Sequence, residues 1–292
     1  MSNSSVRQGL SKKSASPLLG SFLKTLSHLS VWIYAAALAL PIYYVVISSM
    51  KTNQEIFLSP ASLPTNWSLV NYSLAWEAAS LGDGLINSSI VVLFSLAINL
   101  ALAIPAAFAI ARSENRLSRA LSGLFAAGFL IPPFAALVAT VLLSIWLELF
   151  HTKLFLILYY PAMTMPLAVL LLTQYMRSIP KELAESAKID GASQLQILVH
   201  IYIPLSRPAI VSVVVVNFIN LWNEYLFALI LAGPKVSNQT VQVALPTLTG
   251  VYTSDYGLLA AGTVISLVPV YLVYAILQRR LEGALAAGAV KG

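Results

Sequence analysis

Six long apolar stretches run along the chain and alternate with polar segments. A helix needs roughly 20 residues to cross about 30 Å of hydrocarbon, and every stretch reaches that length. Five stretches contain no Asp, Glu, Lys or Arg, and the remaining one contains only Glu224. The pattern predicts an all-α polytopic membrane bundle with six transmembrane helices at residues 31–50, 85–111, 120–147, 154–176, 209–232 and 258–278. These helices form one domain, 31–278, between an N-terminal tail, 1–30, and a C-terminal tail, 279–292.

Prolines interrupt the predicted helices. The third stretch is longer than a membrane requires and contains Ile131-Pro132-Pro133, so we expect that helix to break there or to lie partly along the outer interface. Each proline removes a backbone donor, which a membrane tolerates where neighbouring helices satisfy the freed carbonyl. We therefore expect a packed bundle rather than independent anchors. The prolines concerned are Pro41, Pro105, Pro132, Pro133, Pro161, Pro166 and Pro269.

The composition supports a membrane protein and excludes any chemistry that depends on cysteine. Apolar residues make up 58% of the 292 residues and charged residues only 10%, whereas soluble domains carry about 25% charge. The mean hydropathy is +0.81. The absence of cysteine excludes disulfides and thiolate metal sites, and the three histidines lie far apart in the sequence. We expect no catalytic residue, no metal site and no nucleic-acid partner.

The positive charges are distributed unevenly between alternate polar segments. Cytoplasmic segments of membrane proteins are enriched in Lys and Arg, so the richer set marks the inside and both termini are predicted to be cytoplasmic. The poorer set is Lys51, Lys153 and Lys235; the richer set is Arg7, Lys12, Lys13, Lys24, Arg112, Arg116, Arg119, Arg177, Lys181, Lys188, Arg207, Arg279, Arg280 and Lys291.

The cytoplasmic segment 177–208 is too regular for an ordinary loop. It reads as two short helices, the first beginning after Pro180 and ending at Asp190-Gly191. Glycine takes the positive φ that closes a helix, and Asp190 or Ser193 can cap the next one. Such a segment favours docking into a groove on a cytoplasmic partner, and the alternative is a helix lying on lipid headgroups.

The spacing in this segment resembles the EAA loop of ABC importer permeases. The match consists of Glu185-Ser186-Ala187, Asp190-Gly191-Ala192 and Ile201, followed by Ile203-Pro204. Ser186 stands where the loop has its second alanine, and Ile203 where it has leucine. Trp222-Asn223-Glu224-Tyr225 and the last five residues are further similar to the maltose-permease G-type subunits of carbohydrate importers.

The resemblance implies a type I ABC importer permease, that is, half of a pore in the bacterial cytoplasmic (inner) membrane. It implies a second permease subunit in a heterodimer, two cytoplasmic ATPase subunits and an extracytoplasmic solute-binding protein. The chain has no Gly-x-x-x-x-Gly-Lys-Ser/Thr phosphate loop, so ATP and Mg²⁺ are expected on the ATPase subunits. The coupling residues are then Glu185, Ser186, Ala187, Asp190, Gly191, Ala192, Ile201 and Pro204, and a sugar, oligosaccharide or sugar-like polyol is the expected substrate.

Polar residues inside the fifth stretch indicate the pathway. Asn217, Asn220 and Glu224 are spaced to share one helix face, with Asn223 close by, and intramembrane ionisable residues usually face a bundle interior or a water-filled path. These four residues either line the substrate route or bond to neighbouring helices.

The outer segment 233–257 is either a contact with the binding protein or an ordinary solvated loop. Two other functions stay open: a permease for another small solute, and an ion-coupled secondary transporter, which would often carry an inverted repeat.

Overall fold

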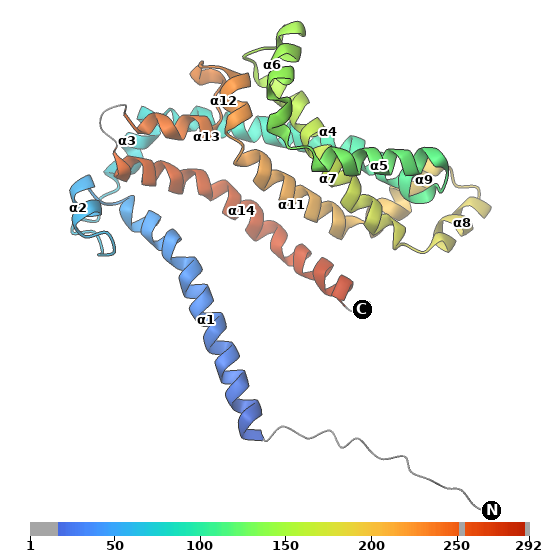
Figure 1. Cartoon of the computed structure of the whole chain (residues 1–292), viewed down its shortest axis with the longest axis horizontal. Coiled ribbons are helices and arrows are strands. Elements are labelled where there is room, and N and C mark those ends of the chain that lie inside the picture. The colour runs from blue at the N-terminus through green and yellow to red at the C-terminus, as the bar shows by residue number, and fades with distance from the viewer. Residues whose placement is uncertain (1–16, 251–254, 290–292) are drawn as a thin grey trace, which may run out of the picture.

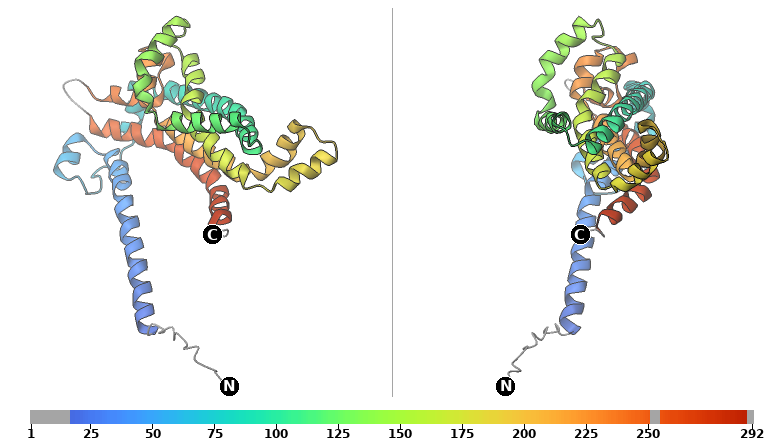
Figure 2. Two further views of the ribbon diagram at one scale, coloured as in Figure 1. Left: turned by 45° about the vertical axis from the view of Figure 1, so that its right-hand side comes forward. Right: turned by 90° about the vertical axis from the view of Figure 1, so that its right-hand side faces the viewer.

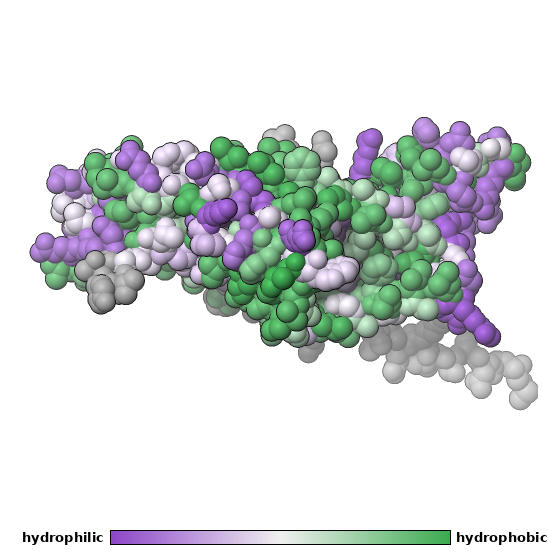
Figure 3. Space-filling view, turned by 90° about the horizontal axis from the view of Figure 1, so that it is seen from above, coloured by the Kyte–Doolittle hydropathy of each residue, from purple (hydrophilic) through white to green (hydrophobic). Residues whose placement is uncertain are grey.

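The computed structural model describes residues 17–250 and 255–289, and their side chains over 25–250 and 255–278. Four helices form the body and run along its long axis (Figure 1): α4 (Leu81–Arg112), α7 (Lys153–Arg177), α11 (Arg207–Trp222) and α14 (Tyr256–Ala289). Residues 1–16 and 290–292, which belong to the two predicted tails, lie outside the described part. Hydrophobic side chains gather over the middle of the molecule and hydrophilic ones at its two ends (Figure 3), as a membrane-spanning bundle requires.

The structure agrees with the prediction of six spans. Four helices are long and apolar enough to cross a membrane, at Thr25–Ser48, Leu81–Arg112, Lys153–Arg177 and Tyr256–Gln278, and the number rises to six if each of two bent helix pairs, Arg116–Leu130 with Pro133–Trp146 and Gln194–Leu205 with Arg207–Trp222, counts as one span. The second pair begins in segment 177–208, before the predicted fifth span. The first span belongs to α1 (Pro17–Ser48), which begins well before residue 31 and extends away from the body (Figure 2).

The third span breaks at its Pro132-Pro133 pair, as expected. The helix α5 (Arg116–Leu130) ends there, and the chain turns by 93° into η1 (Pro133–Ala136) and α6 (Leu137–Trp146). Pro132 lies in extended conformation at φ −66° and ψ 128°, which no α-helix accommodates. The segment η1–α6 therefore stands apart from the body and contacts α12 (Leu226–Ala232).

A neighbouring helix satisfies the carbonyl that a proline frees. Pro161 in α7 has no N–H to donate to Ile157, and the Ser95 hydroxyl of α4 donates to that carbonyl instead, at 3.3 Å. One turn further on, Asn99 Nδ2 donates to Thr164 Oγ1 at 2.9 Å. These bonds join α4 to α7, which make the most extensive helix contact in the fold.

The buried side chains form two clusters along the bundle. The first cluster surrounds Tyr160 and Trp222, and the second cluster surrounds Met176 and Val213. Trp222 also donates from its indole to the Ser266 carbonyl at 3.1 Å, which joins α11 to α14. The second cluster includes residues from segment 177–208, so this segment is packed into the bundle.

Short helical elements pack at the end of the bundle that lies opposite segment 177–208 (Figure 1). They are α2 (Asn53–Leu58), α3 (Val70–Ala78), η3 (Val236–Asn238), α13 (Val241–Ala244) and η4 (Leu245–Leu248). Lys51, only 1% exposed, donates from its ammonium to the carbonyls of Ser59 and Pro60 at 2.9 and 3.2 Å. In segment 233–257 the part 241–248 is not a free loop: Val241 is fully buried, and its N–H donates to Ser88 Oγ. Residues 251–254 lie outside the described part.

Candidate functional site

A helical elbow, residues 178–206, protrudes from one end of the bundle (Figure 1). Its first helix is α8 (Lys181–Ile189); its second consists of α9 (Gln194–Ile197), the π-helical turn η2 (Leu198–Tyr202) and α10 (Ile203–Leu205). Gly191 separates the two helices with φ +85°, a conformation that costs other L-residues about 1–2 kcal/mol. Ser193 then caps α9 by accepting from the Gln196 N–H. The two predicted helices and their break are thus present, with Ser193 rather than Asp190 as the capping residue.

The predicted coupling residues gather around the tip of the elbow. A depression of about 380 Å³ lies between the two helices, lined by Ala187, Asp190, Gly191, Ala192, Gln196, Ile197, His200 and Ile201. Glu185 and Ser186 are exposed on α8, and Pro204 is half-buried near the membrane end. Beside the depression Ile189 is 88% exposed.

The base of the elbow is fixed in the second cluster. Ala184, Ile197 and Tyr202 are each at most 2% exposed, so both helices are packed against the bundle. Leu183 and Leu195 face away from it and are 45% and 68% exposed. The elbow is therefore rigid at its base and open at its tip, which suits a segment that transmits a push.

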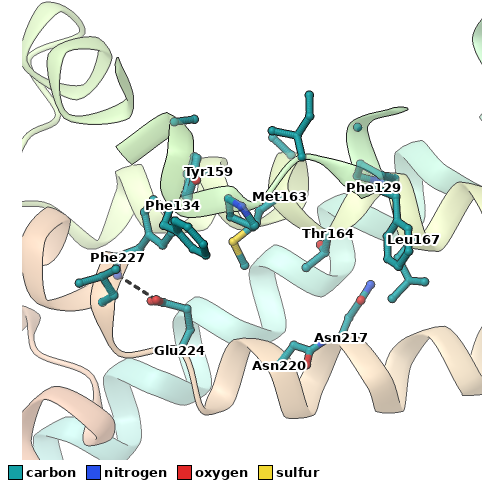
Figure 4. Close-up of a pocket in the computed structure, with 17 residues that line it drawn as sticks. Phe129, Phe134, Tyr159, Met163, Thr164, Leu167, Asn217, Asn220, Glu224 and Phe227 are labelled. Carbon is teal, nitrogen blue, oxygen red and sulfur yellow. Dashed lines mark hydrogen bonds between the residues drawn. The ribbon is translucent and has the colours of Figure 1, made fainter. Parts of the chain in front are cut away.

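A second candidate site is a cavity of about 740 Å³ among α5, η1, α7 and α11 (Figure 4). Asn217 and Asn220 of α11 lie on one side of it, opposite Met163 and Thr164 of α7 (Figure 4). Aromatic rings complete the wall, namely Phe129, Phe134, Tyr159 and Phe227. Such a cavity offers hydrogen bonds on one side and apolar contact on the other. The sequence missed its α5, η1 and α7 residues, because their neutral side chains carry no signal in an apolar stretch.

Asn217, Asn220 and Glu224 all line this cavity, as the sequence grouped them, whereas Asn223 does not, which corrects its place in the predicted pathway. The helix α11 ends at Trp222, and residues 223–225 form a break before α12. Asn223 does not line the cavity; its amide donates to the Ile219 carbonyl and accepts from Gln242 Nε2. The helical spacing assumed a continuous helix, whereas the chain leaves the helix one residue before Asn223.

Glu224 lines the cavity, yet its carboxylate is engaged by the protein. Oε2 accepts from the Tyr160 hydroxyl at 2.7 Å and from the Ala228 N–H at 2.9 Å, and Oε1 accepts from the Phe227 N–H at 2.8 Å. Two of these donors are N–H groups at the start of α12, which have no partner within their own helix. Glu224 thus closes the break in the fifth span and joins it to α7.

Asn217 differs from Glu224 in having no partner. Its side chain is 1% exposed and lines the cavity, and among the described residues neither amide atom forms a hydrogen bond. A buried polar group without a partner costs about 1–3 kcal/mol, so this side chain is a candidate for a bond that forms in another state. Nowhere in 25–250 and 255–278 do three His, Asp or Glu side chains gather as a metal site.

Comparisons with known proteins identify the family. Residues 99–286 match the family described as binding-protein-dependent transport system inner membrane component. The chain is 34% identical over 264 residues to the diacetylchitobiose uptake system permease protein NgcG of Streptomyces coelicolor, covering 90% of this chain and 87% of that protein. It is also 34% identical to the melibiose/raffinose/stachyose import permease protein MelC of Bacillus subtilis over 262 residues, 89% and 94% of the two chains.

Solved structures support the fold. A bacterial ABC transporter involved in the import of the acidic polysaccharide alginate aligns with a TM-score of 0.78 at 21% identity, covering 92% of this chain and 99% of that one. The MetNI methionine ABC transporter aligns with a TM-score of 0.56 at 16% identity, covering 74% and 99%. The six-span bundle is thus the type I ABC importer permease fold. The chain belongs to the family of inner membrane components of binding-protein-dependent transport systems, and it is an ABC importer permease rather than an enzyme.

Proposed function

We propose that this chain forms half of the pore of an ATP-driven importer for a sugar, oligosaccharide or sugar-like polyol. The elbow carries this proposal, because it offers a rigid base and an open tip to a cytoplasmic partner. Relatives named as diacetylchitobiose and melibiose/raffinose/stachyose permeases support the substrate class. The cavity agrees with it, since amides and a hydroxyl face aromatic rings there.

The proposed assembly has four further members. A second, different permease subunit completes the pore, two ATPase subunits bind the elbows from the cytoplasm with their ATP and Mg²⁺, and a solute-binding protein delivers substrate from outside. Both termini then lie in the cytoplasm. The elbow carries the exposed side chains of Lys181 and Lys188. This supports the proposed orientation, because cytoplasmic ends are rich in Lys and Arg.

In this assembly the tip of the elbow makes the ATPase contact. Glu185 is exposed and unpaired among the described residues, and it is placed to meet an Arg or Lys of the ATPase. Gly191 and Ala187 leave the depression open for close approach. Ser186, Asp190, Ala192, Ile201 and Pro204 complete the contact surface and its support.

Gly191→Leu tests the coupling role. A β-carbon added at Gly191 meets nothing within 4 Å, so the variant is expected to insert and assemble its helices, while the strained φ and the added bulk break the ATPase contact. Uptake should fall at least tenfold relative to ATP hydrolysis. Gly123→Leu on α5, also in open space, is the matched control and should transport like the parent. Wild-type uptake by Gly191→Leu would refute the assignment.

The cavity is proposed as part of the substrate route. Asn220 is exposed to the cavity, and Asn217 is buried in its wall. Asn223 and Glu224 instead form hydrogen bonds at the break in the fifth span. Asn220→Leu should weaken uptake of the sugar several-fold without changing the ATPase rate that the binding protein stimulates. Asn223→Leu, outside the cavity, is the comparison variant; equal uptake by the two variants would remove the cavity from the route.

A further inference from the structure

The elbow has a contact to α4 that its docking role does not require. Tyr202, at the end of η2, is fully buried. Its ring meets the Phe108 ring edge-on, with centroids 4.8 Å apart, and the guanidinium carbon of Arg112 lies 5.6 Å from the ring centroid. Phe108 and Arg112 occupy the last two turns of α4. One aromatic side chain of the elbow is therefore held between a ring and a cation of the neighbouring helix, in a geometry that favours attraction.

The backbone around Tyr202 is bent, so a side-chain contact is needed if the elbow and α4 are to move together. In η2 the Ile203 N–H donates to the Leu198 carbonyl, five residues back, and Pro204 has no N–H to donate to His200. The chain then bends by 74° where α10 meets α11. Widened π-helical turns recur at functional sites, and here the widened turn lies next to a bend. With the backbone alone as a connection, a push on α8 would turn the elbow about this bend and leave α4 in place.

A second contact between the elbow and α4 is weaker. Lys181 Nζ donates to Glu114 Oε1 at 2.6 Å, just beyond the end of α4, but the two side chains are 59% and 82% exposed. Exposed ion pairs contribute little to holding two elements together. The Tyr202 contact is buried and Arg112 is half-buried beside it, so Tyr202 is the stronger connection.

We propose that Tyr202 is a positioning residue that makes the elbow and α4 move as one body when the ATPase subunits push. Because α4 packs along α7 more extensively than any other helix pair among the described residues, the push then reaches α7 and the Thr164 side of the cavity through α4 as well as through the chain connection between α7 and α8. Without Tyr202 the elbow would keep its chain connections to α7 and α11 but lose this aromatic contact to α4. This inference rests on the proposed coupling role of the elbow.

Three variants of the complete transporter test it, each reconstituted in proteoliposomes with its second permease subunit, ATPase subunits and binding protein. Tyr202→Leu keeps an apolar side chain but removes the ring, and should raise the number of ATP molecules hydrolysed per substrate at least threefold. Arg112→Gln should raise it by a smaller factor, and the double variant should add little to Tyr202→Leu. Tyr202→Phe keeps the ring and removes a hydroxyl that has no partner among the described residues, so its ratio should stay within twofold of wild type.

A distance measurement separates positioning from mere stability. The chain contains no cysteine, so spin labels at Ser113→Cys and Gln194→Cys report on α4 and the elbow alone. The distance between them should be the same with and without ATP in the parent, and should change with ATP in Tyr202→Leu. An ATP-dependent distance in the parent, or an unchanged hydrolysis ratio in Tyr202→Leu, would overturn the proposal.

Crosslinking from Ile189→Cys to the ATPase distinguishes this failure from failure of the coupling role. If the crosslink never forms in the otherwise wild-type chain, the elbow does not dock and both proposals fall. If it forms equally in Tyr202→Leu and the parent while the hydrolysis ratio also stays equal, only the role of Tyr202 is refuted.

Discussion

Replacing Glu224 distinguishes a structural from a substrate-contacting role for the intramembrane carboxylate. In Glu224→Ala the Tyr160 hydroxyl and the N–H groups of Phe227 and Ala228 all lose their acceptor. Tyr160 is 1% exposed and Ala228 is fully buried, so these donors can regain an acceptor only from water that enters through the cavity. The change should therefore destabilise the fifth span rather than only empty the cavity.

The size of the effect follows from these three bonds. An interhelical hydrogen bond in a membrane, such as that from Tyr160, contributes about 0.6–1.7 kcal/mol. Loss of the acceptor at the start of a helix costs about 0.5–2 kcal/mol. Glu224→Ala should thus lower the free energy of unfolding by about 1–4 kcal/mol in total. Glu224→Gln keeps one acceptor oxygen and should cost about 1 kcal/mol.

Thermal unfolding of the purified complex in lipid nanodiscs measures this loss, and uptake is normalised to the folded fraction. Asn223→Ala is the control: Asn223 is exposed, and its oxygen accepts only from Gln242 among the described residues, so its melting temperature should stay close to that of the parent. A Glu224→Ala complex that melts like the parent but no longer transports would refute the structural role and return Glu224 to the substrate route.

Two further predictions follow from other contacts. Ser95→Ala removes the donor to the carbonyl that Pro161 frees and should destabilise the bundle by about 0.6–1.7 kcal/mol; Ser89→Ala, whose hydroxyl bonds within its own helix, should not, and equal melting temperatures would contradict the reasoning. In the outer segment, hydrogen bonds from Thr65 and then Thr52 lower the pKa of Glu55 from 4.5 to about 2. The ionised carboxylate therefore stabilises residues 52–65 fully above pH 4.5, and this contribution is lost as the pH falls toward 2. Hydrogen exchange of that segment, corrected for intrinsic rates, should show constant protection from pH 7 to 4.5 and lower protection at pH 7 in Glu55→Gln; unchanged protection in the variant would disprove the role of the carboxylate.

The sequence by itself determined the membrane class, the number of spans and the two-helix form of the elbow. Each of these is a local property. An apolar run of sufficient length crosses the membrane whatever surrounds it, and Gly191 followed by Ser193 ends one helix and begins the next through the conformation and hydrogen bonding of those residues alone. The break at Pro132-Pro133 is local in the same way.

Only the tertiary structure decided what the polar residues of the fifth span do. Whether α11 continues past Trp222 depends on Tyr160, which lies 64 residues before Glu224, and on the free N–H groups of α12, since these donors hold the Glu224 carboxylate. The cavity and the contact of Tyr202 with Phe108 and Arg112 arise in the same way. They depend on which faces of separate helices meet, and helical periodicity within a uniformly apolar stretch does not encode that choice, because every face is apolar.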